Sequence, residues 1–342
     1  DFQSSAMLLG QTFDAGVSIM KHHLNRRQFL AASAYAATGL ALGLNLTSCA
    51  EKPAENTLHK ALIIDKPTEG VLKKVKDAGF DGVEAGIVSP AEAAKARKVA
   101  EKLEMRIHSV MRGWAKFNSK NPDEVESSLA TTVDALIAAQ SYGADAILLV
   151  PGRINGLKMP KPWEFRIEFD SKTGHLTTVA EKHNDRYGDY IAAHNHAYDT
   201  FQAAIRRLIP TAKKTGVVIA LENVWNNLFV DPHHMAHFVD SFQSSWVRSY
   251  FDIGNHVKYS PPQHWIAILG KRIAKCHVKD FKLNPDGHGG RFVNIRDGSV
   301  NWPVVTKALK DIGYRGWMTI EGSEKVSMQE RSRRLDLIIA GK

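Results

Sequence analysis

The chain has 342 residues, of which 44% are hydrophobic and 24% are charged, and it carries a formal net charge of +9. This length, without any low-complexity tract, predicts a substantial core in one large domain or two small ones. The chain has only two cysteines, which excludes a disulfide framework. The basic residues are spread thinly, so the positive charge is weak evidence for nucleic acid or an anionic membrane face.

An export signal is predicted near the start of the chain. From Met20, a basic stretch with Arg26 and Arg27 precedes an apolar run rich in Ala, Leu and Gly, which ends in small residues at Cys49. The segment "NRRQFL" resembles the twin-arginine export motif, and "LTSC" resembles a bacterial lipobox in which Cys49 is lipidated. The run is too short and too rich in Ala and Gly for a membrane span. A buried helix with a chance Arg pair is the alternative.

These features predict how the chain is divided. Residues 1–19 are expected to be an upstream or artefactual extension, 20–49 the signal, 50–57 a polar linker and 58–342 the folded domain. The protein is therefore expected to be an exported, membrane-anchored lipoprotein of the periplasm or cell envelope. Its expected contact with the membrane is through the lipid anchor alone.

Past the linker, short apolar runs alternate with helical patterns such as 89–104, 122–143 and 301–314. The predicted strands are 61–65, 82–87, 106–110, 146–150, 217–223, 249–254, 274–278 and 317–321. Near-continuous apolar strands separated by helices indicate a parallel sheet. Eight such units in this length fit an α/β fold, the (β/α)₈ TIM barrel. A doubly wound open sheet is the alternative, but no Gly-rich phosphate-binding fingerprint follows the first strand.

One connection is unusually long. About 35 residues, 151–187, separate the fourth predicted strand from its helix, and "SKTG" within them predicts the turn of a β-hairpin. An insertion after strand four lies on the catalytic rim of a barrel, where it would act as a lid. A purely structural hairpin is the alternative.

Polar residues close four consecutive predicted strands. Glu222 ends the fifth, Asp252 the sixth, His277 the seventh and Glu321 the eighth. In a barrel these ends converge, and three carboxylates without partners would repel one another. One divalent cation resolves the repulsion, and mainly oxygen donors suit Mn²⁺, Mg²⁺ or Co²⁺, with Zn²⁺ as an alternative. Any one of these residues alone is as readily an ordinary residue of the barrel rim as a metal ligand. The four together favour a metal site.

Four segments, "IALENVWN", "YFDIGN", "CHVKD" and "TIEG", in this order resemble the sugar isomerase/epimerase superfamily of xylose-isomerase-like TIM barrels, over about residues 58–340. The superfamily includes ketose 3-epimerases and endonuclease IV-type DNA repair enzymes. The resemblance implies that Glu222, Asp252, His277 and Glu321 ligate the metal. It also implies that Glu222 and Glu321 are the catalytic pair, facing the substrate carbon from opposite sides and moving a proton through an enediolate.

The surroundings of the site depart from the ketose 3-epimerase pattern. Those enzymes usually carry a His three positions after the strand-six Asp, where this chain has Asn255. They also carry an Arg shortly after the strand-seven His, where this chain has Lys279 and Lys282. The substrate of one subfamily therefore does not transfer. The residues predicted to bind substrate are Glu84, His108, Asn223, Asn255, His256 and Lys279, with structural roles an equal alternative for Glu84 and His108.

Four functions compete. The first is a metal-dependent isomerase or epimerase, and export favours a non-phosphorylated carbohydrate as its small-molecule substrate, because sugar phosphates are cytoplasmic. The same site would also suit a lyase or hydrolase acting on 3-keto-glycosides. A non-catalytic carbohydrate-binding lipoprotein is the third, although both glutamates are present. DNA repair, suggested by the basic charge and the histidines of 183–237, conflicts with export and with the lack of a basic-aromatic stripe, so nucleic acid is not an expected partner.

Overall fold

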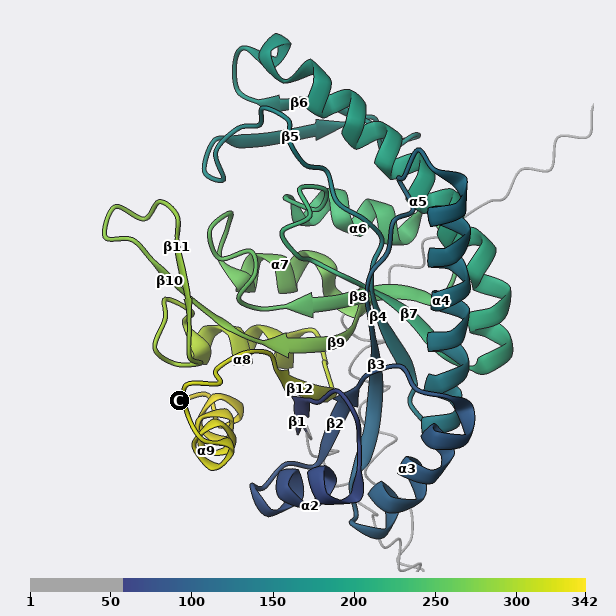
Figure 1. The fold of residues 1–342 in the computed structure, drawn as a ribbon. Coiled ribbons are helices and arrows are strands. Elements are labelled where there is room, and N and C mark those ends of the chain that lie inside the picture. Colours follow the sequence, from purple (N-terminus) through teal and green to yellow (C-terminus); the bar gives the residue numbers. More distant parts are fainter. Residues whose placement is uncertain (1–57) are drawn as a thin grey trace, which may run out of the picture. The chain divides into compact units, whose positions relative to one another are not determined.

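The computed structural model describes residues 58–342, and the predicted signal, Cys49 and the linker lie outside them. Eight strands close into a barrel in the order β1-β12-β9-β8-β7-β4-β3-β2 (Figure 1). All neighbouring barrel strands are parallel. The strands are β1 (Leu58–Ile63), β2 (Gly82–Ala85), β3 (Arg106–Trp114), β4 (Ala146–Val150), β7 (Val218–Glu222), β8 (Val247–Asp252), β9 (Ile273–Val278) and β12 (Gly316–Ile320). The predicted TIM barrel is confirmed, and the doubly wound alternative is wrong.

Helices follow the strands and cover the outside of the barrel (Figure 1). They are α2 (Glu69–Asp77), α3 (Pro90–Lys102), α4 (Pro122–Tyr142), α5 (Gly188–Thr215), α6 (Pro232–Asp240), α7 (Pro262–Leu269), α8 (Trp302–Asp311) and α9 (Met328–Ile339), with short 3₁₀ helices at η1 (Asn184–Tyr187) and η2 (Gly270–Arg272). Their ends follow local rules: Ser89 and Glu92 form a capping box before α3, and Gly143 ends α4 in the left-handed conformation. None of the helices in residues 58–342 combines the length and apolarity that crossing a membrane requires.

Two hairpins extend from the barrel (Figure 1). The insertion after β4 carries β5 (Phe165–Phe169) and β6 (Leu176–Ala180), paired antiparallel across the turn at 171–174, as predicted. A second hairpin, β10 (Asp280–Leu283) and β11 (Gly290–Val293), follows β9 and was not predicted. The two meet where Trp163, just before β5, stacks on His288 between β10 and β11, with ring centroids 4.3 Å apart.

Asp280, the last residue of "CHVKD", organises the chain beyond the second hairpin. Its buried carboxylate accepts hydrogen bonds from the backbone N–H groups of Arg296 at 2.9 Å and Gly298 at 3.2 Å, and from the indole of Trp302 at 3.2 Å. One carboxylate thus satisfies several donors of segment 294–302, the connection between β11 and α8. A buried carboxylate that receives this many hydrogen bonds has a structural role.

The interior of the barrel is packed with side chains. Leu148 and Val150 of β4, Ala220 of β7 and Tyr250 of β8 form a buried cluster separate from the main core under the helices. Side chains two residues apart point to the same face of a strand, so Tyr250 lies one layer below Asp252. The ring of Tyr250 packs on that of His277, with centroids 4.5 Å apart, and so forms part of the floor beneath the strand ends.

Candidate metal centre and active site

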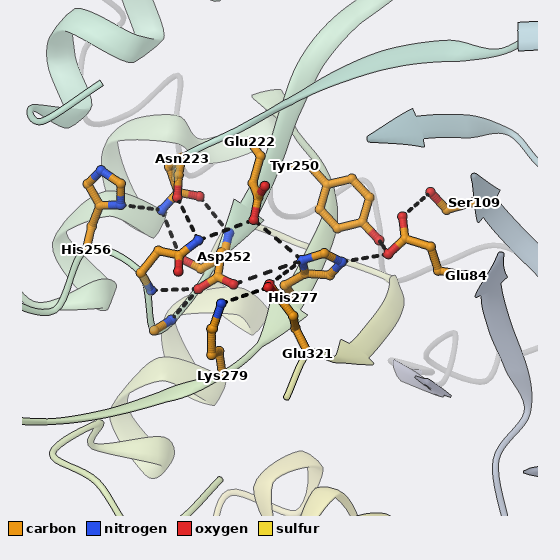
Figure 2. A network of polar contacts seen from close by, with 12 residues as sticks. Glu84, Ser109, Glu222, Asn223, Tyr250, Asp252, His256, His277, Lys279 and Glu321 are labelled. Atoms are coloured by element: carbon orange, nitrogen blue, oxygen red, sulfur yellow. Dashed lines mark hydrogen bonds and ion pairs between the residues drawn. The ribbon is translucent and has the colours of Figure 1, made fainter. Parts of the chain in front are cut away.

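The structure brings together the four residues predicted as metal ligands. Glu222 ends β7, Asp252 ends β8, His277 lies in β9 and Glu321 follows β12 directly. Each offers one ligand atom, and these four atoms lie within 4.8 Å of one another (Figure 2). Ligands on opposite sides of an ion are separated by about two metal–ligand bonds, or about 4–5 Å. The spacing is therefore that of a single-ion site.

Three buried atoms of this cluster have no hydrogen-bond partner among residues 58–342: Asp252 Oδ2, His277 Nδ1 and Glu321 Oε2. From His277 Nδ1, the carboxylate oxygens of Glu321, Glu222 and Asp252 lie at 3.1, 3.6 and 4.0 Å. Buried polar atoms in proteins nearly always have partners. Three such atoms directed at one another therefore fit the requirement of a bound cation.

The carboxylate of Asp252 is fixed by the chain around it. Its Oδ1 accepts hydrogen bonds from the backbone N–H groups of Gly254 at 2.8 Å and Asn255 at 2.6 Å. The Asn223 side chain accepts from the Asp252 backbone N–H at 2.6 Å and donates to its carbonyl at 2.9 Å. Asn223 also contacts buried His256 Nδ1 at 3.2 Å. These bonds fix one carboxylate oxygen and leave the other, Oδ2, facing the cluster.

The imidazole of His277 is oriented by Glu84 from β2. Its Nε2 lies 2.6 Å from Glu84 Oε2, and Glu84 also receives the hydroxyls of Ser109 at 2.9 Å and Tyr250 at 3.3 Å (Figure 2). A carboxylate behind a metal-ligating His is a common means of fixing its tautomer. Although burial would lower the pKa of His277, the negative charge of Glu84 and the close carboxylates of Glu222 and Glu321 raise it well above its usual range.

The two glutamates have different neighbours. Glu222 Oε1 accepts a hydrogen bond from Asn255 Nδ2 at 3.2 Å, whereas Glu321 Oε1 pairs with Lys279 Nζ at 2.7 Å. In each case the second oxygen makes no such bond. The Glu321 side chain is 30% exposed and that of Glu222 is 8% exposed, so the cluster opens toward solvent beside Glu321.

Burial makes this group of carboxylates electrostatically costly. It raises the pKa of Glu222, and it raises that of Asp252 well above its usual range. Glu321 differs: although burial opposes it, the close imidazole of His277 and the charges of His277 and Lys279 lower its pKa below the usual range. A bound cation would relieve the repulsion that these buried groups exert on one another.

His108 is not brought to this cluster. It is fully buried, stacks on Trp317 with ring centroids 4.4 Å apart, and its Nε2 lies 3.0 Å from the Thr319 hydroxyl. Trp317, Thr319 and Glu321 alternate along one face of the chain, so His108 contacts the layers below Glu321. Glu84 is likewise fully buried, behind the imidazole of His277. The other residues predicted to bind substrate, Asn223, Asn255, His256 and Lys279, lie around the cluster as described above.

Two polar residues of the site were missed by the sequence analysis. Tyr250 and Ser109 both donate to Glu84 and thereby support His277 from inside the barrel. A signal for Tyr250 was available, because it lies two positions before Asp252 and must share its face of the strand. Ser109 carries no such signal, since its role depends on where β2 and β3 pair.

Residues 72–336 match the family model described as "Xylose isomerase-like TIM barrel". The chain belongs to this family. The rhizopine catabolism protein MocC of Rhizobium meliloti is 23% identical over 269 residues, which are 76% of each chain. Among solved structures, a D-tagatose 3-epimerase-like protein is similar with a TM-score of 0.62 and 18% identity, over 82% of this chain and 98% of that one. The 3-keto-D-glucoside 4-epimerase YcjR of E. coli has a TM-score of 0.61 and 12% identity, over 83% of this chain and all of that one.

Proposed function

We propose that this protein is a divalent-metal-dependent isomerase or epimerase that acts on a non-phosphorylated carbohydrate. The observation that carries the proposal is the cluster at the strand ends. There, three buried ligand atoms that have no hydrogen-bond partner among residues 58–342 face one another, and both glutamates of the proposed catalytic pair belong to the cluster. The family and the similar epimerase structures support a sugar as the substrate class.

Glu222, Asp252, His277 and Glu321 would hold the ion. When bound, a divalent ion such as Mn²⁺, Mg²⁺ or Co²⁺ supplies positive charge that stabilises the negative charge developing on a substrate carbonyl oxygen. The donor set, three carboxylates and one imidazole, suits these ions, and Zn²⁺ remains an alternative.

The chain itself supplies the proton transfer. Glu222 and Glu321 approach the cluster from β7 and from the end of β12, and each has one oxygen held by a neighbour and one free. One glutamate would remove the proton from the carbon next to the carbonyl, and the other would return a proton to the opposite face or the neighbouring carbon. Asn255 and Lys279 would keep the two carboxylates in place during this exchange.

A second candidate reaction is elimination or hydrolysis of a 3-keto-glycoside, because removal of the same α-proton also starts that chemistry. Room for a substrate larger than one free sugar supports it: a groove of about 420 Å³ runs beside Glu321 and Lys279. The name of the similar 3-keto-D-glucoside 4-epimerase supports 3-oxo sugars as compounds to test.

Exchange of the α-proton with solvent tests the proposal directly. Free sugars and their 3-oxo glycosides are incubated with the protein and Mn²⁺ in D₂O, and NMR follows deuterium incorporation and products. We expect metal-dependent deuterium uptake that EDTA abolishes. A pure binding protein would bind the sugar without any exchange, and that result would contradict the proposal.

We also propose that the protein is exported and lipidated at Cys49, which lies outside the described residues. Fatty-acid labelling of cells tests this: Cys49→Ala should abolish incorporation, and Arg26→Lys combined with Arg27→Lys should block translocation. A wild-type protein that remains unlabelled in the cytoplasm would contradict it.

A further inference from the structure

A groove of about 420 Å³ opens beside the metal cluster. Its walls are the β10–β11 hairpin on one side and the loop 321–325 on the other, and it reaches the cluster through Lys279 and Glu321. Its volume falls within the roughly 300–1,000 Å³ of small-molecule sites. A substrate held at the cluster can therefore extend a second part into this groove.

The β10–β11 hairpin places two basic side chains next to each other at the groove. Lys282 of β10 and Arg291 of β11 are directly opposite each other in the antiparallel register, and both line the groove. Like charges directly opposite on paired strands are destabilising. Among residues 58–342, neither side chain forms an ion pair with an acid of the groove, because Glu321 and Asp297 are paired with other cations. Both side chains are exposed, so solvent screens part of this repulsion, and an anion bound between them would lower it further.

The acidic residues of the groove do not neutralise this pair. Glu321 is paired with Lys279 at 2.7 Å, and Asp297 is paired with Arg334 at 2.7 Å. The remaining acid, Glu324, acts electrostatically on Arg331 and forms no ion pair with Lys282 or Arg291 among residues 58–342. The Lys282–Arg291 pair is therefore left as an excess of positive charge.

We propose that this groove binds an anionic group of the substrate, a carboxylate or a sulfate, so that the substrate is an acidic carbohydrate such as a hexuronoside. The proposal rests on the proposed function, which places the reacting sugar at the metal cluster. Arg offers a planar pair of donors to a carboxylate or sulfate, and Lys adds a compact charge beside it. The anion would also remove the repulsion between the two strands of the hairpin.

Equilibrium binding without turnover tests the groove. Isothermal titration compares methyl β-D-glucuronide, methyl β-D-glucoside 6-sulfate and neutral methyl β-D-glucoside in the presence of Mn²⁺. The wild-type protein should bind at least one anionic probe about tenfold or more tighter than the neutral one, as charge-assisted hydrogen bonds allow. Which anion is preferred separates carboxylate from sulfate, and higher salt should shrink the difference.

The variant Lys282→Gln/Arg291→Gln should lose this preference and bind all three probes alike. It should remain folded, because it removes a repulsion from the hairpin, and circular dichroism checks this. The matched control is Lys213→Gln/Lys214→Gln in the last turn of α5, which lowers the net charge equally and should keep the preference.

The proposal is overturned if the wild type binds no anionic probe, if it binds anionic and neutral probes equally, or if the hairpin variant keeps the preference. Deuterium exchange is measured separately, on neutral and on acidic 3-oxo sugars. Exchange without anion preference would refute the groove and leave the proposed function intact, whereas anion preference without exchange would refute only the proposed function.

Discussion

The metal cluster at the strand ends and the histidines beneath the β5–β6 hairpin are both built around histidine side chains, most of them buried. We call the second group, His194, His234 and His237, the hairpin histidines. His234 Nε2 contacts the carbonyl of Gly174 at 2.8 Å, and His237 Nε2 contacts that of Ser171 at 2.9 Å. Both carbonyls belong to the turn of the β5–β6 hairpin. His234 and His237 of α6 therefore fasten this turn to the barrel, while His194 of α5 contacts the carbonyl of Leu228 at 3.1 Å.

The difference between the two regions lies in the partners. His277 faces three carboxylates, of which Asp252 and Glu321 each keep one buried oxygen without a hydrogen-bond partner among residues 58–342, whereas His234 and His237 face backbone carbonyls. Burial lowers the pKa of His194 to about 3 and that of His234 to about 4, so both are neutral at pH 7. Among residues 58–342, one group of side chains has the spacing of a metal site, and no hairpin histidine belongs to it. The histidines of 183–237 thus give the DNA repair alternative no second metal site.

The largest expected effect is on turnover, which should depend on the metal cluster and not on the hairpin histidines. Glu321→Gln and Glu222→Gln should each lower turnover by roughly 10²–10⁴-fold, because each removes one positioned proton-transfer group. Steady-state kinetics with Mn²⁺ measure this. A variant with one working glutamate should still exchange the substrate α-proton with D₂O while failing to form product.

The control for these variants is His234→Gln, which keeps an amide nitrogen near the position of Nε2 and should leave turnover unchanged. If both glutamate variants turn over normally with metal bound, proton transfer by Glu222 and Glu321 is refuted. Only a binding or Lewis-acid function would then fit the cluster.

The next effect concerns stability and pH. Unfolded His234 titrates near pH 6.5, but the folded group does so near 4. Between these values the unfolded chain binds a proton that the native protein does not, so the free energy of unfolding falls as the pH falls. One such His contributes about 3 kcal/mol of this loss between pH 7 and pH 4.

Urea unfolding at several pH values checks that contribution. His234→Gln should lose stability at pH 7, because its hydrogen bond to Gly174 is altered, but its stability should depend less on pH than that of the wild type. Equal pH dependence in both proteins would show that His234 is not buried and neutral as described.

The smallest effect is expected from Glu84→Gln. This change keeps the shape and a hydrogen-bond acceptor behind His277 but removes the charge that orients and polarises the imidazole. Mn²⁺ affinity should fall by roughly 10–100-fold, as for other groups behind a metal ligand. Calorimetric titration measures it, and an affinity equal to that of the wild type would mean that Glu84 only packs.

The barrel and its four strand-end residues could be predicted because both depend on local patterns. Apolar strands alternate with helices, and four consecutive barrel strands have a polar residue at or next to their end, such as Asp252 or His277. The β10–β11 hairpin was not predictable in this way, because each of its strands has only four residues, on either side of the loop "NPDGHG". Its position depends on distant contacts such as Trp225 on Phe292, with ring centroids 4.8 Å apart.

The roles of the residues that face the barrel interior could not be predicted from the sequence either. Glu84 and His108 occupy similar places near predicted strand ends, yet one supports His277 and the other stacks on Trp317. Which neighbour each meets is set by the register between strands and by the bulge between β2 and β3. A local pattern does not contain that information.

Mn²⁺ binding measured by electron paramagnetic resonance tests the central claim most directly. The wild-type protein should bind one Mn²⁺ per chain. Asp252→Ala/His277→Ala should lose the site while circular dichroism shows a folded barrel, and His234→Gln/His237→Gln should retain it. Absence of bound Mn²⁺ in the wild type, or binding that survives loss of Asp252 and His277 but not of the hairpin histidines, would contradict the assignment of the metal site to the strand ends.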